Sequence, residues 1–202
     1  MKKQIYNIKL PLLLLFLTFC PFVLFSINNP VEIKKGMVLV YQFENNNQKN
    51  DFIVTVDDFK TTLSFSFKMT NQKRTTGKIS LSKEALKNAI SQYNYFQSND
   101  VALENQTSIW VSKKVWKNIK KKKKCFISTN SGELSLKELE FVNNQNYPLQ
   151  MNGNDSILNV MYCITKDSNA YKYWILDDPN NPLILKMELN FSIELIEIKY
   201  LN

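Results

Sequence analysis

The stretch YWILDDPNNPLILKM, residues 173–187, determines more of the fold than any other part of this chain. Two apolar runs flank a short polar segment that is rich in aspartate, asparagine and proline. The order Asp-Pro-Asn-Asn at residues 178–181 favours a type I turn, and Pro182 starts a return strand where a missing N–H costs little. The stretch therefore predicts an antiparallel hairpin in which residues 171–176 pair with residues 183–189.

Both faces of this predicted hairpin are apolar. Side chains alternate along a strand, so Tyr171, Tyr173 and Ile175 share one face, whereas Trp174 and Leu176 share the other. A sheet in water usually has one wet face, and two apolar faces therefore predict cover on both sides. Helices, a second sheet, a ligand or a partner would supply this cover; the alternative is a thick, close-packed core.

Strand patterns also occupy much of the remaining chain. Residues 61–70, TTLSFSFKMT, alternate apolar and polar side chains with the period of a half-buried strand. The sequence MNGND, residues 151–155, is typical of a tight hairpin turn. In residues 190–200 the apolar positions change parity at Leu195–Ile196, which predicts a β-bulge there.

Two short helices are expected among these strands. Ser82 and Ser112 are suitable N-cap residues, and each precedes a segment with helical periodicity, KEALKNAISQ at residues 83–92 and KKVWKNIKKKKK at residues 113–124. Together the patterns predict an α+β, β-dominated fold. Its main part is one long antiparallel sheet, curled like a half-barrel, accompanied by the two helices.

Residues 1–26 have the layout of a secretory signal peptide. A basic start precedes an uncharged apolar run that extends from Leu10 to Ile27, and a cleavage site follows Ser26. The basic residues of that start are Lys2, Lys3 and Lys9. Two alternatives stay open: an uncleaved membrane anchor, and a lipoprotein acylated at Cys20.

All three interpretations export the chain. They place residues 28–202, a single β-rich domain, in the periplasm, in the cell envelope, or outside the cell as a secreted protein. Two cysteines, Cys125 and Cys163, remain after cleavage at Ser26. An oxidising compartment permits a disulfide between them, and the alternative is a pair of buried free thiols.

The chain contains no histidine. Its absence removes Ser-His-Asp and Cys-His nucleophiles and the histidine-ligated metal sites. We therefore expect no enzyme, no cofactor and no metal site. Asp177 and Asp178 are the candidates for a carboxylate-based hydrolase or a Ca²⁺ site, but their sequence context is that of a turn.

A dense lysine run follows Ser112. It comprises Lys113, Lys114, Lys117, Lys120, Lys121, Lys122, Lys123 and Lys124, with Trp116 among them, in a chain of net charge +8. An anionic membrane surface or an acidic polymer would be attracted to this run, and a solvated segment without a partner is the alternative. Few arginines and few interleaved aromatics disfavour a specific nucleic acid.

Two stretches carry a resemblance to known proteins. TSIWVSKKVWKNI, residues 107–119, and the hairpin stretch resemble two signatures of a group of uncharacterised exported bacterial proteins. This resemblance covers most of residues 36–200 and implies no activity. The general layout also looks like that of the half-barrel lipoprotein carriers of the bacterial envelope, although Phe19 stands before Cys20 where a lipobox has a small residue.

Three functional hypotheses follow. The first is a non-enzymatic extracytoplasmic envelope protein that binds an apolar or amphiphilic ligand, such as a lipid, or a partner protein. The second is a structural or interaction module with a filled core and no small ligand. The third is the carboxylate-based hydrolase.

Overall fold

The computed structural model describes residues 31–70, 74–129, 136–168 and 170–201. Its first half contains β1 Met37–Asn45, β2 Gln48–Asp58, β3 Leu63–Met69, β4 Thr76–Leu81, α1 Lys83–Asn88, β5 Ser91–Gln92, β6 Asp100–Leu103 and β7 Gln106–Thr107. The second half contains α2 Lys113–Lys122, β8 Lys124–Ser128, β9 Leu136–Met151, β10 Asn154–Thr165, β11 Lys172–Leu176, β12 Ile184–Glu188 and β13 Ser192–Tyr200.

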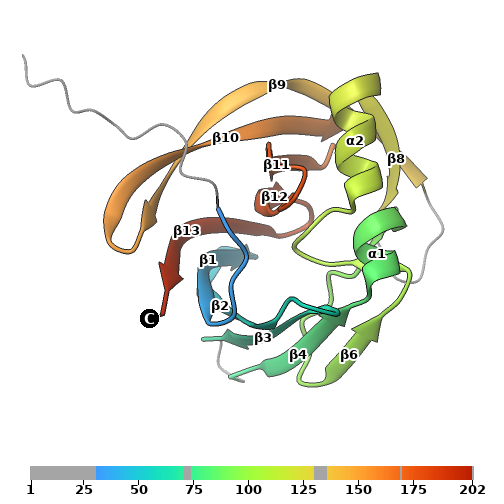
Figure 1. Ribbon diagram of the computed structural model, residues 1–202. Coiled ribbons are helices and arrows are strands. Elements are labelled where there is room, and N and C mark those ends of the chain that lie inside the picture. The colour runs from blue at the N-terminus through green and yellow to red at the C-terminus, as the bar shows by residue number, and fades with distance from the viewer. Residues whose placement is uncertain (1–30, 71–73, 130–135, 169, 202) are drawn as a thin grey trace, which may run out of the picture.

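All thirteen strands belong to one curled sheet, ordered β6-β4-β3-β2-β1-β13-β12-β11-β10-β9-β8-β5-β7. Both helices lie on one side of the molecule, beside the edge formed by the short strands (Figure 1). The predicted β-dominated α+β fold, with a long curled sheet and two short helices, is confirmed. Most pairings are antiparallel, but β4–β6, β5–β7, β5–β8 and β9–β13 are parallel.

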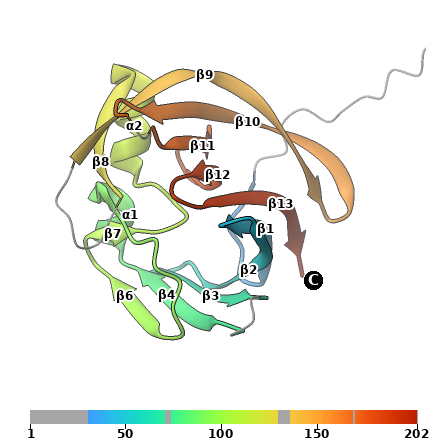
Figure 2. The same cartoon turned by 180° about the vertical axis from the view of Figure 1, so that it is seen from behind.

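Part of the sheet closes on itself. The long hairpin formed by β9 and β10 bends back until its tip reaches β13 (Figures 1 and 2). There Gln150 and Met151 pair in parallel with Glu197 and Ile198, and the Asn152 N–H donates to the Ile198 carbonyl at 2.9 Å. Strands β9 to β13 therefore form a closed ring, which the half-barrel expectation did not include.

The hairpin read from residues 173–187 forms as predicted. β11 pairs with β12 from Lys172–Glu188 onward, and the Asn181 N–H donates to the Asp178 carbonyl at 3.3 Å across the turn. The predicted bulge is also present, because Val40 faces Glu197 while its neighbour Tyr41 faces Leu195. Ile196 is thus the extra residue of β13.

The second predicted turn lies between β9 and β10. Asn152 and Gly153 have φ values of 50° and 77°, the left-handed conformation that a two-residue hairpin turn of type I′ requires. Both residues are exposed, and they join the two longest strands of the sheet.

Both helices begin where the serines predicted. The Ser82 hydroxyl accepts from the Ala85 N–H at 3.0 Å, and the Ser112 hydroxyl accepts from the Val115 N–H at 3.2 Å. The first helix is shorter than its pattern, because the backbone turns extended at Ala89 and residues 91–92 become strand β5. The gain of sheet hydrogen bonds outweighs another helical turn there.

The interior of the sheet is filled. Its largest fully buried side chains are Trp110, Tyr41, Tyr173, Phe52 and Phe65. Every residue of the buried core cluster lies between Val31 and Ile198, so a fragment of residues 28–202 keeps all of the core that the structure describes. We therefore expect this fragment, which is of ordinary domain size, to fold without the preceding residues.

The outer face of the hairpin is covered by its own neighbours. Tyr173 and Ile175 are fully buried inside, whereas Trp174 is half-buried outside and stacks on Tyr162 with 4.8 Å between the ring centroids. The Lys186 amine lies 5.2 Å from the Trp174 ring centroid. The apolar character of both faces thus reflects a close-packed core and an aromatic pair on the outer surface.

Candidate functional site

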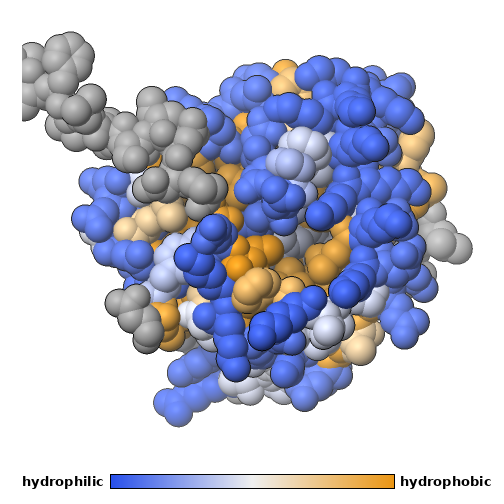
Figure 3. Space-filling model, viewed as in Figure 1, coloured by the Kyte–Doolittle hydropathy of each residue, from blue (hydrophilic) through white to orange (hydrophobic). Residues whose placement is uncertain are grey.

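A pocket of about 680 Å³ opens beside the two helices. Its wall is mainly apolar, and polar groups stand around it; the lining residues are Val31, Glu32, Ile33, Lys34, Phe59, Leu63, Leu86, Trp110, Val111, Lys113, Asp178, Asn180, Asn181 and Pro182. Figure 3 shows apolar surface at the centre of this side of the molecule, with hydrophilic surface around it. The volume lies within the range of small-molecule sites.

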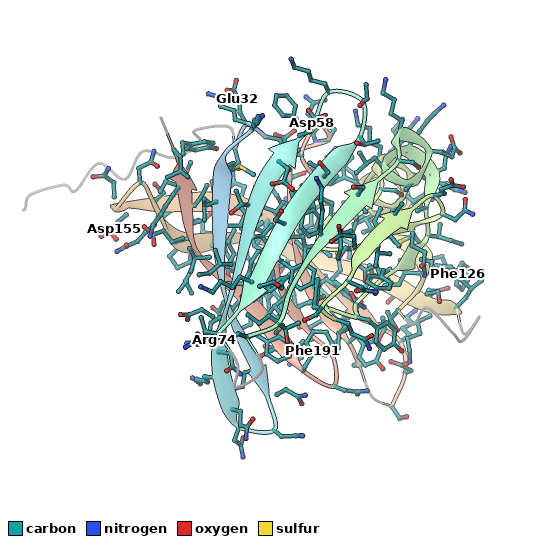
Figure 4. All side chains as sticks on the ribbon, turned by 90° about the horizontal axis from the view of Figure 1, so that it is seen from below. Glu32, Asp58, Arg74, Phe126, Asp155 and Phe191 are labelled. Carbon is teal, nitrogen blue, oxygen red and sulfur yellow. The ribbon has the colours of Figure 1, made fainter. Side chains whose placement is uncertain are left out.

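Five separate parts of the chain form the pocket. Residues 31–34 precede β1, residues 59–63 lead from β2 into β3, and Leu86 comes from α1. Residues 110–113 lead into α2, and residues 178–182 form the β11–β12 turn. Figure 4 shows Glu32 and Asp58 at the same end of the sheet, with Arg74 toward the opposite end. The pocket is therefore a feature of the tertiary fold, since no short segment contains it.

Asn181 connects three of these parts. Its side chain is buried, and its Oδ1 accepts from the Trp110 Nε1–H at 2.8 Å while its Nδ2 donates to the Val31 carbonyl at 2.7 Å. The strand-like segment around Trp110 also pairs with Leu183. These bonds hold the N-terminal wall, the Trp110 segment and the β11–β12 turn in one arrangement.

The charged groups at the pocket are mostly exposed. The Lys34 amine lies 2.8 Å from the Glu32 carboxylate, and this hydrogen bond together with the charge lowers the pKa of Glu32. Lys113, the first residue of α2, lies on the same rim and is exposed. The pocket thus combines an apolar wall with both signs of charge at its entrance.

The two aspartates of the turn have separate partners. The Asp177 carboxylate pairs with the Lys120 amine, whereas the Asp178 carboxylate accepts from the Asn180 N–H at 2.8 Å. Both arrangements stabilise the turn and its contact with α2. Within the described ranges, no three or more Cys, Asp or Glu side chains gather as metal ligands.

The predicted lysine run lies on α2 and at the start of β8. Lys120 pairs with Asp177, Lys124 with Glu138, and the Lys123 amine lies 4.2 Å from the Phe141 ring centroid. The other five lysines of the run, Lys113, Lys114, Lys117, Lys121 and Lys122, are exposed. Trp116 instead packs its half-buried side chain against the core, where its Nε1–H has no hydrogen-bond partner.

The structure has Cys125 and Cys163 as buried free thiols, the second of the two alternatives. Cys125 lies on β8 opposite Leu139, and Cys163 lies on β10 opposite Phe141, so strand β9 runs between them. Two strand spacings amount to about 9.6 Å, more than the Cα separation of about 7 Å that a disulfide tolerates. The sheet geometry therefore keeps the two thiols apart.

Both thiols are expected to resist alkylation in the folded protein. Burial raises the pKa of Cys125 to about 12 and also raises that of Cys163, so neither forms the reactive thiolate near pH 8. Iodoacetamide should label neither cysteine of fragment 28–202 in buffer and both in concentrated urea, as read by mass spectrometry. A mass lower by two hydrogens, together with no labelling in urea, would instead show a disulfide.

The sequence did not indicate several of the pocket residues. Leu86 and Asn181 appeared only as parts of a helix and a turn, and Phe59 was not singled out. The position of Asn181 before Pro182 was explained by turn geometry alone, and no local pattern distinguishes an asparagine that faces solvent from one that is buried. Alternating exposure cannot reveal a pocket whose five parts are distant from one another in sequence.

The predicted signal peptide, its cleavage after Ser26 and the lipid attachment at Cys20 lie outside the described residues. Within the described part of the chain, neither helix has the length and apolar character needed to span a membrane. Comparisons with protein-family models, with curated proteins and with solved structures find no match for the chain. The resemblance to exported bacterial proteins therefore stays a prediction, and the proposed function below rests on the geometry of the pocket.

Proposed function

We propose that this protein is a non-enzymatic, extracytoplasmic binding protein whose ligand is an apolar or amphiphilic molecule. The observation that carries the proposal is the half-open, mainly apolar pocket of about 680 Å³. A ligand would bind at this mouth of the fold, since the interior of the sheet is filled by its own side chains. The export expected from the N-terminal sequence supports the extracytoplasmic location.

The pocket chemistry favours an amphiphile over a fully polar ligand. Apolar side chains from Ile33, Leu63, Leu86 and Val111 would remove an alkyl or aryl group from water, at about 0.8 kcal/mol per buried methylene. A polar head group would remain at the entrance among the exposed charges. Among the described residues, the carboxylates that line the pocket are those of Glu32, which pairs with Lys34, and Asp178, which accepts from the Asn180 N–H, so neither is free for acid–base chemistry.

The second hypothesis, an interaction module without a small ligand, is favoured by the same filled interior. A direct test uses fragment 28–202 with the fluorescent apolar probe N-phenyl-1-naphthylamine. Leu86→Glu places a carboxylate in the pocket wall and should weaken probe binding about tenfold, because the probe then buries less apolar surface. Lipid extraction and mass spectrometry of the unmodified fragment should in addition find a co-purified amphiphile.

Val142→Glu is the matched control, since Val142 is exposed on β9 and does not line the pocket. Both variants exchange an aliphatic side chain for the same carboxylate, and this control should bind the probe as the unmodified fragment does. Absence of both probe binding and a bound amphiphile would contradict the ligand proposal and favour the interaction module.

A further inference from the structure

The outward face of α2 is a continuous basic surface beside the pocket. Val115 and Ile119 are buried, which turns the opposite side of the helix to solvent. At 100° per residue, Lys113, Lys117 and Lys121 follow one another along that exposed side, and Lys114 lies next to them. We call these four lysines the α2 basic face.

This basic face has little compensation from nearby acids. The acidic partners in contact with the run, Asp177 and Glu138, pair with Lys120 and Lys124. Within the residues that the structure describes, no ion pair involves the four lysines of the α2 basic face. Their mutual repulsion weakens the helix slightly, so a bound polyanionic surface would stabilise this arrangement.

The rim of the pocket continues the basic face and adds an exposed aromatic side chain. Lys113 belongs to both surfaces, and Phe59, which is 44% exposed, lines the same pocket. Lys60 follows Phe59 and is also exposed. Phe59 stands between Asp58 and Lys60 in the sequence. An exposed aromatic ring beside a basic helix face is typical of proteins that insert an apolar group at a membrane interface.

We propose that the α2 basic face and the Phe59 rim dock the protein onto an anionic phospholipid bilayer, with the pocket mouth toward the lipid head groups. Charge complementarity supplies the attraction, and the Phe59 ring would enter the head-group region. The docking goes beyond ligand binding, since it needs only the surface residues and holds whether or not the pocket is occupied.

A bilayer fits this surface better than an acidic polymer. Nucleic acids and other phosphate polymers are held best by arginine forks and stacked aromatics, but Arg74 is the one arginine of the chain and lies away from Glu32 and Asp58, which mark the pocket end (Figure 4). Trp116, the aromatic side chain within α2, packs inward. The α2 basic face, which reaches the apolar pocket at Lys113, matches the layered chemistry of a bilayer surface.

The test is co-sedimentation of fragment 28–202 with phosphatidylcholine vesicles that contain about one third phosphatidylglycerol. The Lys114→Gln, Lys117→Gln and Lys121→Gln triple variant leaves the pocket lining intact and should lower the partition coefficient about a hundredfold at low salt, since each lysine contributes about a factor of five. Glutamine is nearly as helix-favouring as lysine, and circular dichroism verifies that the fold persists.

The matched control exchanges Lys49, Lys68 and Lys199 for glutamine. These lysines are exposed on β2, β3 and β13, away from α2. Their exchange for glutamine removes the same net charge as the α2 triple variant does. This control should keep vesicle binding within about threefold of the unmodified fragment. Equal losses in the two triple variants would overturn the proposal, because binding would then depend on net charge alone.

Phe59→Ser separates a bilayer from a polymer. It should lower vesicle binding several-fold and leave binding to double-stranded DNA, the polyanion used for comparison, unchanged. Equal binding to neutral and anionic vesicles, or DNA binding that depends on the α2 basic face while vesicle binding does not, would contradict the proposal. Probe binding by the α2 triple variant should stay unchanged, so failure of docking and failure of ligand binding are distinguishable.

Discussion

Replacing Asn181 with leucine is expected to lower the free energy of unfolding by about 2–5 kcal/mol, since an orphaned buried polar group costs about 1–3 kcal/mol. The change leaves the Trp110 indole N–H and the Val31 carbonyl without their partners in a buried environment. Both groups lie at the pocket, so probe affinity should fall as well. Urea denaturation of fragment 28–202, followed by tryptophan fluorescence, measures the change in stability.

Asn180→Leu is the control for this experiment. Asn180 precedes Asn181 in the same turn but is exposed, and its backbone N–H, which binds Asp178, is retained in the variant. Its stability should stay within about 0.5 kcal/mol of the unmodified fragment. Equal stability of the two leucine variants would mean that the hydrogen bonds of Asn181 to Trp110 and Val31 do not stabilise the fold.

Replacing Gly77 with alanine is expected to destabilise the fold by about 2–3 kcal/mol, through overpacking. A Cβ at this position would meet the Asn99 carbonyl oxygen at 2.5 Å and the Phe67 ring at 2.7 Å. The carbonyl belongs to the backbone beside β6, and the ring packs against Phe52 and Phe96, so neither moves freely. Urea denaturation gives the stability change, and hydrogen exchange should show faster opening of residues 100–103.

Gly153→Ala separates this crowding from backbone strain. Gly153 has a φ of 77° with open space around it, so its alanine variant carries only the left-handed strain of about 1 kcal/mol. The Gly77 variant should therefore be the less stable of the two. The reverse order would mean that the β4–β6 contact accommodates a methyl group without resistance.

The elements that short-range chemistry determines were predictable from the sequence. The β11–β12 turn follows from an Asp-Pro-Asn-Asn order, the two helix starts from Ser82 and Ser112, and the bulge in β13 from a change of parity. Each of these signals lies within a few residues of the structure it predicts. Local propensity and patterning agree there with the final fold.

The features that depend on distant contacts were not predictable. Nothing within residues 136–151 shows that the end of β9 pairs with β13, because two parallel residue pairs leave no periodic trace. The pocket was missed for the same reason. The sequence showed the lysine run and its helix, but it did not show which of the lysines form ion pairs. Turn signals identified Asn181 but not its burial, which depends on Val31 and Trp110.

The place of β13 in the sheet order has a consequence for biosynthesis. This strand is made after the other described strands, yet it lies between β1 and β12 and also receives the tip of the β9–β10 hairpin. Until β13 has been synthesised, β1 and β12 have no strand between them, and the ring of β9 to β13 is incomplete. Pairing of β13 with β1, which comes from the other end of the described chain, is therefore expected to be a late step of folding.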